Sequence, residues 1–171
     1  MRFALLFPQV AERETRTMKV FEALPATDPR HVPVDEYGFD ELYCTERGCD
    51  CRRVMINVLA RHARQHVATI NHAFEKPAKE EIVSEQTFLD PLNRQSKSAG
   101  GLLDLFVNVV LADEQYHQRL LRHYRMFKEV VEDLRHPAHQ LLHSPHAGAV
   151  PAAGPSRSKR SPLRAKRKRW K

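Results

Sequence analysis

Residues 53–60 read RVMINVLA, and this stretch decides the fold. Its even-numbered positions are all apolar and mostly β-branched: Val54, Ile56, Val58 and Ala60. Apolar residues that alternate with a period of two indicate a β-strand with one buried face. We therefore expect a strand over 53–60, and the neighbouring segments follow from it.

Two flanking segments carry the same alternation. Residues 37–44, YGFDELYC, place three aromatic side chains on one parity, and Glu41 interrupts the set: Tyr37, Phe39 and Tyr43. Residues 66–74, HVATINHAF, place Ala68, Ile70 and Phe74 on one face. The connections are short, and short connections join antiparallel strands. The pattern predicts a three-stranded antiparallel β-meander.

After residue 98 the apolar period changes from two to that of a helix. Within residues 99–110, apolar residues recur at i, i+3, i+4 and i+7, which predicts a helix. Gly100 and Gly101 are unfavourable inside a helix, so we expect this helix to start late. A second helix is expected from an N-cap at Asp113 to Pro137. Its inner stripe comprises Tyr116, Leu120, His123, Phe127, Val130 and Leu134. A helical hairpin over one face of the meander gives an α+β fold.

The chain is predicted to have three parts. Residues 1–33 are poorly patterned, residues 34–136 form the α+β domain, and residues 137–171 form a disordered linker, rich in His, Pro and Ala, that leads into a basic tail. Met18 opens MKVFEALP and reads as a second initiation point, so residues 1–17 can also be interpreted as an extension rather than structure.

Charge and hydropathy narrow the functional classes. The chain has 171 residues and a formal net charge of +7. Residues 156–171 hold nine Lys or Arg and no acid, whereas the rest has 19 basic and 21 acidic residues. No stretch approaches the roughly 20 apolar residues of a membrane span, and the opening MRFALLFP lacks a secretory pattern. We expect a cytoplasmic protein.

All three cysteines lie in YCTERGCDCRR, residues 43–53, with the spacing C-x4-C-x-C. Clustered thiols in a cytosolic protein indicate a metal or redox site rather than a structural disulfide. Thiolates favour zinc, which binds sulfur at about 2.3 Å in a tetrahedron. The prediction is a zinc site formed by Cys44, Cys49 and Cys51. A redox pair of Cys49 and Cys51, and three thiols without a ligand, remain alternatives.

The cysteines leave a fourth zinc position open. His123 is the predicted fourth donor, because it lies on the inner stripe of the second helix. A core histidine held by hydrogen bonds is the competing interpretation. His117 is expected on a flanking face, and Asp50 is a weaker candidate. A water or substrate in that position would instead make the centre catalytic.

The C-terminal part carries two further patterns. Histidines recur at 136, 139, 143 and 146, which could bind a metal weakly, but the intervening prolines favour a linker. The basic tail predicts non-specific affinity for nucleic acid or another polyanion, and a solvated tail is the alternative. Its basic residues are Arg157, Lys159, Arg160, Arg164, Lys166, Arg167, Lys168, Arg169 and Lys171.

Three segments together resemble a bacterial family with a YC-x4-CDCRR signature, a DPLN-x-QS turn and an RHY-x2-FK helix. They are YCTERGCDCRR, FLDPLNRQSKSAGGLLDLF and RLLRHYRMFK, within residues 37–128. The resemblance implies that these segments belong to one unit, and it implies no reaction. It covers neither the N-terminal segment nor the basic tail.

The sequence therefore predicts a small zinc-stabilised binding module whose basic tail binds nucleic acid without sequence specificity. One alternative is a thiol redox or metal-dependent enzyme that uses Cys49 and Cys51. Another is an interaction protein that holds no metal.

Overall fold

The computed structural model describes residues 1–75 and 85–143 of the chain. Five strands form one antiparallel sheet in the order β1-β2-β3-β4-β5. The strands are β1 (Arg16–Val20), β2 (Asp35–Leu42), β3 (Arg53–Ala60), β4 (Gln65–Ala73) and β5 (Thr87–Leu89). The helices are α1 (Phe3–Leu6), α2 (Pro8–Glu14), α3 (Ala99–Leu105), the π-helical η1 (Phe106–Val110), α4 (Glu114–Glu132) and the 3-10 turn η2 (His139–His143).

The central strand is the one that the alternating pattern predicts. β3 buries Val54, Ile56, Val58 and Ala60, and its other residues are half-buried. β2 and β4 pair with it on either side in antiparallel register. The α+β class and the antiparallel meander are therefore confirmed, whereas the predicted number of three strands is too small. β1 and β5 are short edge strands with weak alternation, which gave no clear signal.

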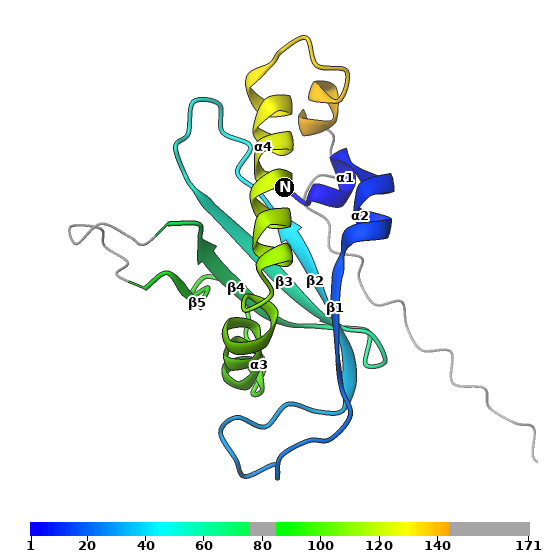
Figure 1. Cartoon of the computed structure of the whole chain (residues 1–171), viewed down its shortest axis with the longest axis vertical. Coiled ribbons are helices and arrows are strands. Elements are labelled where there is room, and N and C mark those ends of the chain that lie inside the picture. The colour runs from blue at the N-terminus through cyan, green and yellow to red at the C-terminus, as the bar shows by residue number, and fades with distance from the viewer. Residues whose placement is uncertain (76–84, 144–171) are drawn as a thin grey trace, which may run out of the picture.

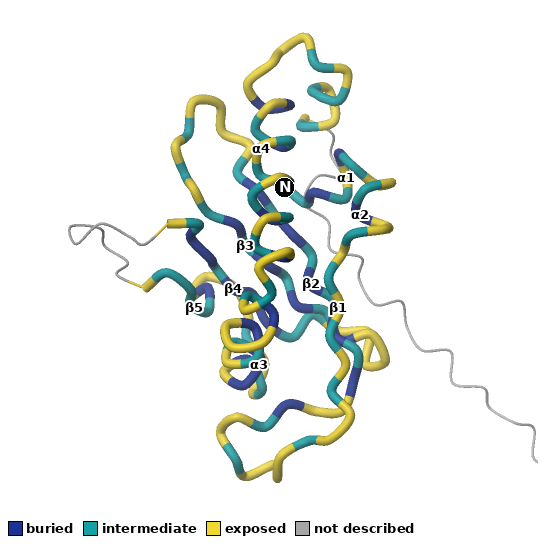
Figure 2. The backbone as a smooth tube through the Cα atoms, in the orientation of Figure 1, coloured by how far each residue is buried: buried dark blue, intermediate teal, exposed yellow. Residues whose placement is uncertain are grey.

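Helices cover the buried face of the sheet. Figure 1 shows α4 lying across the strands, with α1 and α2 beside it and α3 near one end. The inner stripe of α4 is buried at Tyr116, Leu120, His123, Phe127 and Val130, and Figure 2 shows its outer face exposed. The predicted cap at Asp113 is present, because its side chain accepts a hydrogen bond from the backbone N–H of Gln115.

The predicted end of α4 is too late. The helix ends at Glu132 rather than at Pro137, and Leu134 is 61% exposed instead of lying on the inner stripe. Residues 139–143 then form η2, and Ala138 and Leu142 pack against the core. The segment after His143, for which the sequence predicts disorder, lies outside the described residues.

The N-terminal residues belong to the same core. Phe3, Leu6 and Ala11 are buried in it, and β1 pairs with β2 from Arg16 to Val20. The predicted boundary at residue 34 is therefore no structural boundary, and residues 1–17 are part of the fold. The N-terminal elements α1, α2 and β1 are each too short to show a clear hydrophobic period.

Close packing, not a late helix start, explains the second glycine of α3. The helix begins at Ala99, and a Cβ on Gly101 would lie 2.5 Å from the backbone oxygen of Arg30. A Cβ on Gly100 would meet no atom within 4 Å. Only Gly101 is required by tertiary contact, and the predicted late start is wrong.

Candidate metal centre

The three cysteines lie in the loop between β2 and β3, residues 43–52, as the sequence predicts. Cys44, Cys49 and Cys51 are free and half-buried, and their Sγ atoms all lie within 4.8 Å of one another. They form the only group of three or more potential ligand side chains at this spacing within residues 1–75 and 85–143. The loop therefore brings three soft donors together, and they could bind a metal ion.

Backbone geometry within the loop orients the sulfur atoms. Gly48 adopts a φ of 70°, a left-handed conformation that glycine allows without steric cost. The backbone N–H of Glu46 donates to Cys44 Sγ at 3.4 Å, and that of Cys51 donates to Cys49 Sγ at 3.4 Å. The turn thus reverses the chain while two sulfurs are held by local hydrogen bonds.

Helix α4 holds the loop from outside. Lys128 Nζ donates to the backbone oxygen of Cys49 at 2.9 Å, and Glu132 accepts from the backbone N–H of Gly48 at 2.9 Å. The two side chains also pair with each other at 3.1 Å. This contact, the α4 clamp, ties the cysteine loop to a rigid helix. The sulfur cluster therefore has a supporting shell made by the fold itself.

The Cys49 and Cys51 thiols differ in how readily they lose a proton. Hydrogen bonds from the Cys51 thiol and backbone lower the pKa of Cys49, so its thiolate is favoured. Burial, followed by the neighbouring Cys49 and Cys44, raises the pKa of Cys51 to about 12. A bound cation would stabilise all three thiolates together and displace the remaining protons. Without a cation, the Cys49 thiol is therefore easier to deprotonate than the Cys51 thiol.

His123 does not complete this cluster, in contrast to the prediction. Its Nδ1 lies 2.7 Å from Glu41 Oε2, and its Nε2 lies 3.1 Å from Glu14 Oε2. The ring is 1% exposed and stacks on Phe3 at a centroid distance of 4.1 Å. Both ring nitrogens face carboxylates, so the core interpretation of this histidine is the correct one. His123 is absent from the donor group in the described residues.

The other candidate donors also lie outside the cluster. The ring of His117 lies 6.0 Å from that of His72, and Asp50 is exposed. His139 Nδ1 lies 2.8 Å from the backbone oxygen of Val130. His146 and all nine tail residues named above lie outside the described residues. Within residues 1–75 and 85–143, the structure therefore brings the three predicted cysteines together and places no predicted histidine with them.

Sequence reasoning missed the cluster around His123. Glu41 and Tyr43 come from β2 and its end, and the Tyr43 hydroxyl donates to Glu41 Oε2 at 2.9 Å. Glu14 at the end of α2 also accepts from Arg122, and its backbone oxygen accepts from Arg119. One signal was present: Glu41 interrupts an inward apolar parity, and a buried carboxylate needs a partner.

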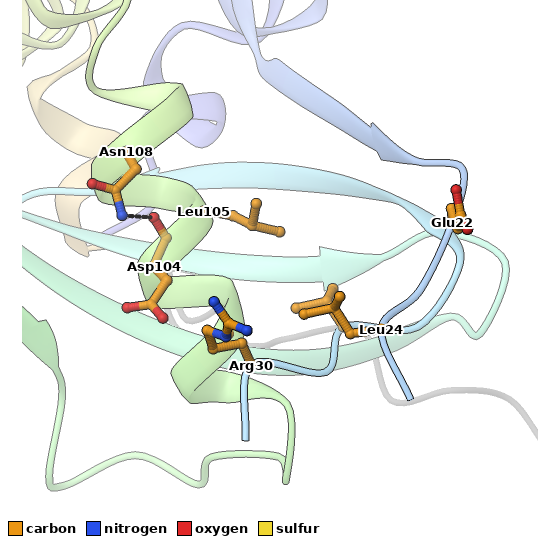
Figure 3. Close-up of a pocket in the computed structure, with 8 residues that line it drawn as sticks. Glu22, Leu24, Arg30, Asp104, Leu105 and Asn108 are labelled. Atoms are coloured by element: carbon orange, nitrogen blue, oxygen red, sulfur yellow. Dashed lines mark hydrogen bonds between the residues drawn. The ribbon is translucent and has the colours of Figure 1, made fainter. Parts of the chain in front are cut away.

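A separate concavity lies between the loop after β1 and the α3–η1 helix. It has a volume of about 440 Å³ and is lined by Glu22, Leu24, Arg30, Val32, Gly101, Asp104, Leu105 and Asn108. Figure 3 shows Arg30 near Asp104, and Asn108 donating to the Asp104 backbone oxygen. Asp28 already pairs with Arg30 at 3.0 Å, which leaves the wall with little free positive charge.

The chain matches no family model, no curated protein and no solved structure in the three comparisons made. The resemblance to the bacterial family therefore stays a prediction. Among the described residues, none of the helices combines the length and the apolar character needed to cross a membrane.

Proposed function

We propose that the protein is a small binding module in which zinc joins Cys44, Cys49 and Cys51 and fixes loop 43–52 beside α4. The observation that carries this proposal is the mutual approach of three sulfurs to within 4.8 Å on a loop that α4 already holds. Thiolate sulfur is a preferred ligand of zinc. The fourth position is taken by water or by a donor from a partner.

Two features favour a binding role over catalysis. Catalytic zinc sites also have three protein ligands and an open position, but they add a group that moves protons. In the described part of the chain, the donor group contains no carboxylate or histidine. Lys128, the α4 cation that contacts the loop, is engaged by the Cys49 backbone oxygen and by Glu132.

Zinc is expected to stabilise a fold that already has its own core. Buried residues of β2, β3, β4 and α4 form one hydrophobic cluster, partly buried residues of β1 and β5 pack against it, and the cysteines are not part of it. A ligand that binds only the folded state stabilises it by about 2.7 kcal/mol at 100 times its Kd. The protein should therefore remain folded without zinc and melt at a lower temperature.

The test is metal analysis of full-length protein purified without a histidine tag. We expect about one zinc per chain by mass spectrometry and a lower Tm after treatment with a chelator. Cys49→Ser should remove both effects. Thr45→Ala, an exposed change in the same loop, is the matched control and should retain them. Absence of zinc together with an unchanged melt would overturn the proposal.

A redox function is the second candidate, and the lowered pKa of Cys49 beside Cys51 favours it. Thiol titration under oxidising and reducing conditions separates the two functions. Zinc release on oxidation supports the binding module, whereas reversible loss of two thiols without metal supports redox chemistry. An interaction protein with an empty cluster would show neither response.

The basic segment 156–171 is proposed to add non-specific affinity for nucleic acid in the cytoplasm. Its nine Lys or Arg support this part of the proposal. Each neutralised phosphate on duplex DNA contributes about 0.9 to the slope of log K against log salt. Deletion of residues 156–171 should abolish salt-sensitive retention on DNA or RNA, and a full-length protein that ignores both at low salt would exclude this partner.

A further inference from the structure

The cysteine cluster offers three sulfur donors and, among the described residues, no fourth side chain within the same spacing. A closed structural zinc site needs four donors. Zinc bound here must therefore take its fourth ligand from elsewhere. A thiophilic element that forms only three bonds would need nothing more than these cysteines, and trivalent arsenic is such an element.

The spacing of the sulfurs suits a three-coordinate centre. Three atoms at the 4.8 Å limit define a triangle whose centre lies about 2.8 Å from each corner. Bonds to sulfur of about 2.3 Å require each sulfur to move inward by about 0.5 Å if the bound atom lies in the sulfur plane, and by more if it lies above that plane. Trivalent arsenic binds three sulfurs as a shallow pyramid, and its lone pair occupies the direction where zinc would need a fourth ligand.

We infer that Cys44, Cys49 and Cys51 together bind trivalent arsenic, taken up as arsenous acid. This inference rests on the same three residues as the proposed function and names a further ligand class for them. The reaction is an exchange without redox change: three As–O bonds break and three As–S bonds form. Each departing hydroxide leaves as water with one thiol proton, so one arsenous acid and three thiols give one trithiolate and three waters.

Access and support both fit this ligand. Each cysteine is half-buried, the residues between Cys44 and Cys49 are exposed, and Figure 2 shows the loop open to solvent along much of its length. Arsenous acid is small and uncharged at neutral pH, so it can reach the sulfurs. The α4 clamp holds the backbone at Gly48 and Cys49, which limits the ordering needed on binding.

The decisive experiment is titration of reduced, metal-free, full-length protein with sodium arsenite. We expect one arsenic per chain, loss of three titratable thiols, and an X-ray absorption spectrum with three sulfur neighbours. Cys44→Ser, Cys49→Ser and Cys51→Ser should each weaken binding by at least about tenfold. Thr45→Ala should bind as the wild type does, and circular dichroism of each variant confirms that it is folded.

The outcomes separate this inference from the proposed function. Zinc binding without arsenite binding overturns the inference and leaves the zinc module intact. Arsenite binding without zinc supports the inference and overturns the zinc module. A spectrum with two sulfurs and one oxygen overturns the three-sulfur site, whichever variants fold. Failure of both ligands to bind overturns both.

Discussion

The cysteine loop and the cluster around His123 both gather polar side chains beside α4, but they draw them from very different distances along the chain. The three cysteines lie within eight positions on one loop, and they are half-buried. His123 meets partners 82 and 109 residues away and is 1% exposed. The first cluster depends on a turn, whereas the second depends on the whole fold.

The two clusters should therefore respond differently when one of their residues is replaced. A loop that is open to solvent can lose a donor and remain hydrated, so the main loss is a ligand. A buried carboxylate that loses its partner has no water to replace it, and its desolvation cost then falls on the folded state. We therefore expect the cysteine loop to govern binding and the His123 cluster to govern stability.

The largest effect should come from His123→Ala. The change leaves Glu41, which is 5% exposed, without its imidazole partner, and it removes the ring that stacks on Phe3. Loss of one partner from a buried ionic or hydrogen-bonded pair should lower the free energy of unfolding by about 3 kcal/mol. Urea denaturation measures this loss, and Arg125→Ala on the exposed face of α4 is the control. A loss below about 1 kcal/mol would break the comparison.

His72 is a second buried histidine and can be compared with His123. Within the described residues, no carboxylate contacts it. It is 3% exposed, and burial, followed by His117 and Arg53, lowers its pKa to about 4. The unfolded chain has a histidine pKa near 6.5, so it binds more protons as the pH falls from 6.5 toward 4. Stability that is present at neutral pH should fall by about 2 kcal/mol at pH 5.

Denaturation of the wild type and of His72→Phe at both pH values isolates this contribution. The variant keeps an aromatic ring and loses the titrating group, so its stability should change less between pH 7 and pH 5. His143→Gln, an exposed change, should behave as the wild type does. Equal acid sensitivity in His72→Phe and the wild type would show that other groups cause the loss.

The two neighbouring glycines of α3 separate the effect of helix propensity from the effect of tertiary packing. Gly101→Ala places a methyl group 2.5 Å from the Arg30 backbone oxygen and should cost about 2 kcal/mol. Gly100→Ala meets open space and should stabilise the protein by about 0.5 kcal/mol. Thermal melts of the two variants should move in opposite directions, and a shift in the same direction would contradict the packing at Arg30.

The last comparison concerns the α4 clamp, where the expected effect is on metal affinity rather than on folding. Lys128→Met removes the hydrogen bond to the Cys49 backbone oxygen but leaves all three sulfurs in place. Groups that orient ligands without touching the metal typically change its affinity by about tenfold or more. Zinc titration against a competing chelator should show a decrease near tenfold, with Arg125→Ala as the control. Unchanged affinity would mean that the loop orients its sulfurs without α4.

Local patterns in the residues determined much of this molecule. Alternation identified β3 and its two neighbours, helical period and an Asp113 cap identified α4, and spacing identified the three cysteines. Each of these features depends on residues that are close along the chain, where periodicity and turn geometry limit the conformations. The same signals were too weak in the short elements α1, α2, β1 and β5.

Only the tertiary structure decided which distant groups meet. It assigned His123 to Glu14 and Glu41 instead of to the cysteines, placed Arg30 against Gly101, and brought Lys128 and Glu132 to the cysteine loop. The hydrophobic period of a helix or strand predicts which residues point inward. Which partner such a residue meets depends on how separate elements dock. That docking is set by the packing of the whole core, which no local pattern contains.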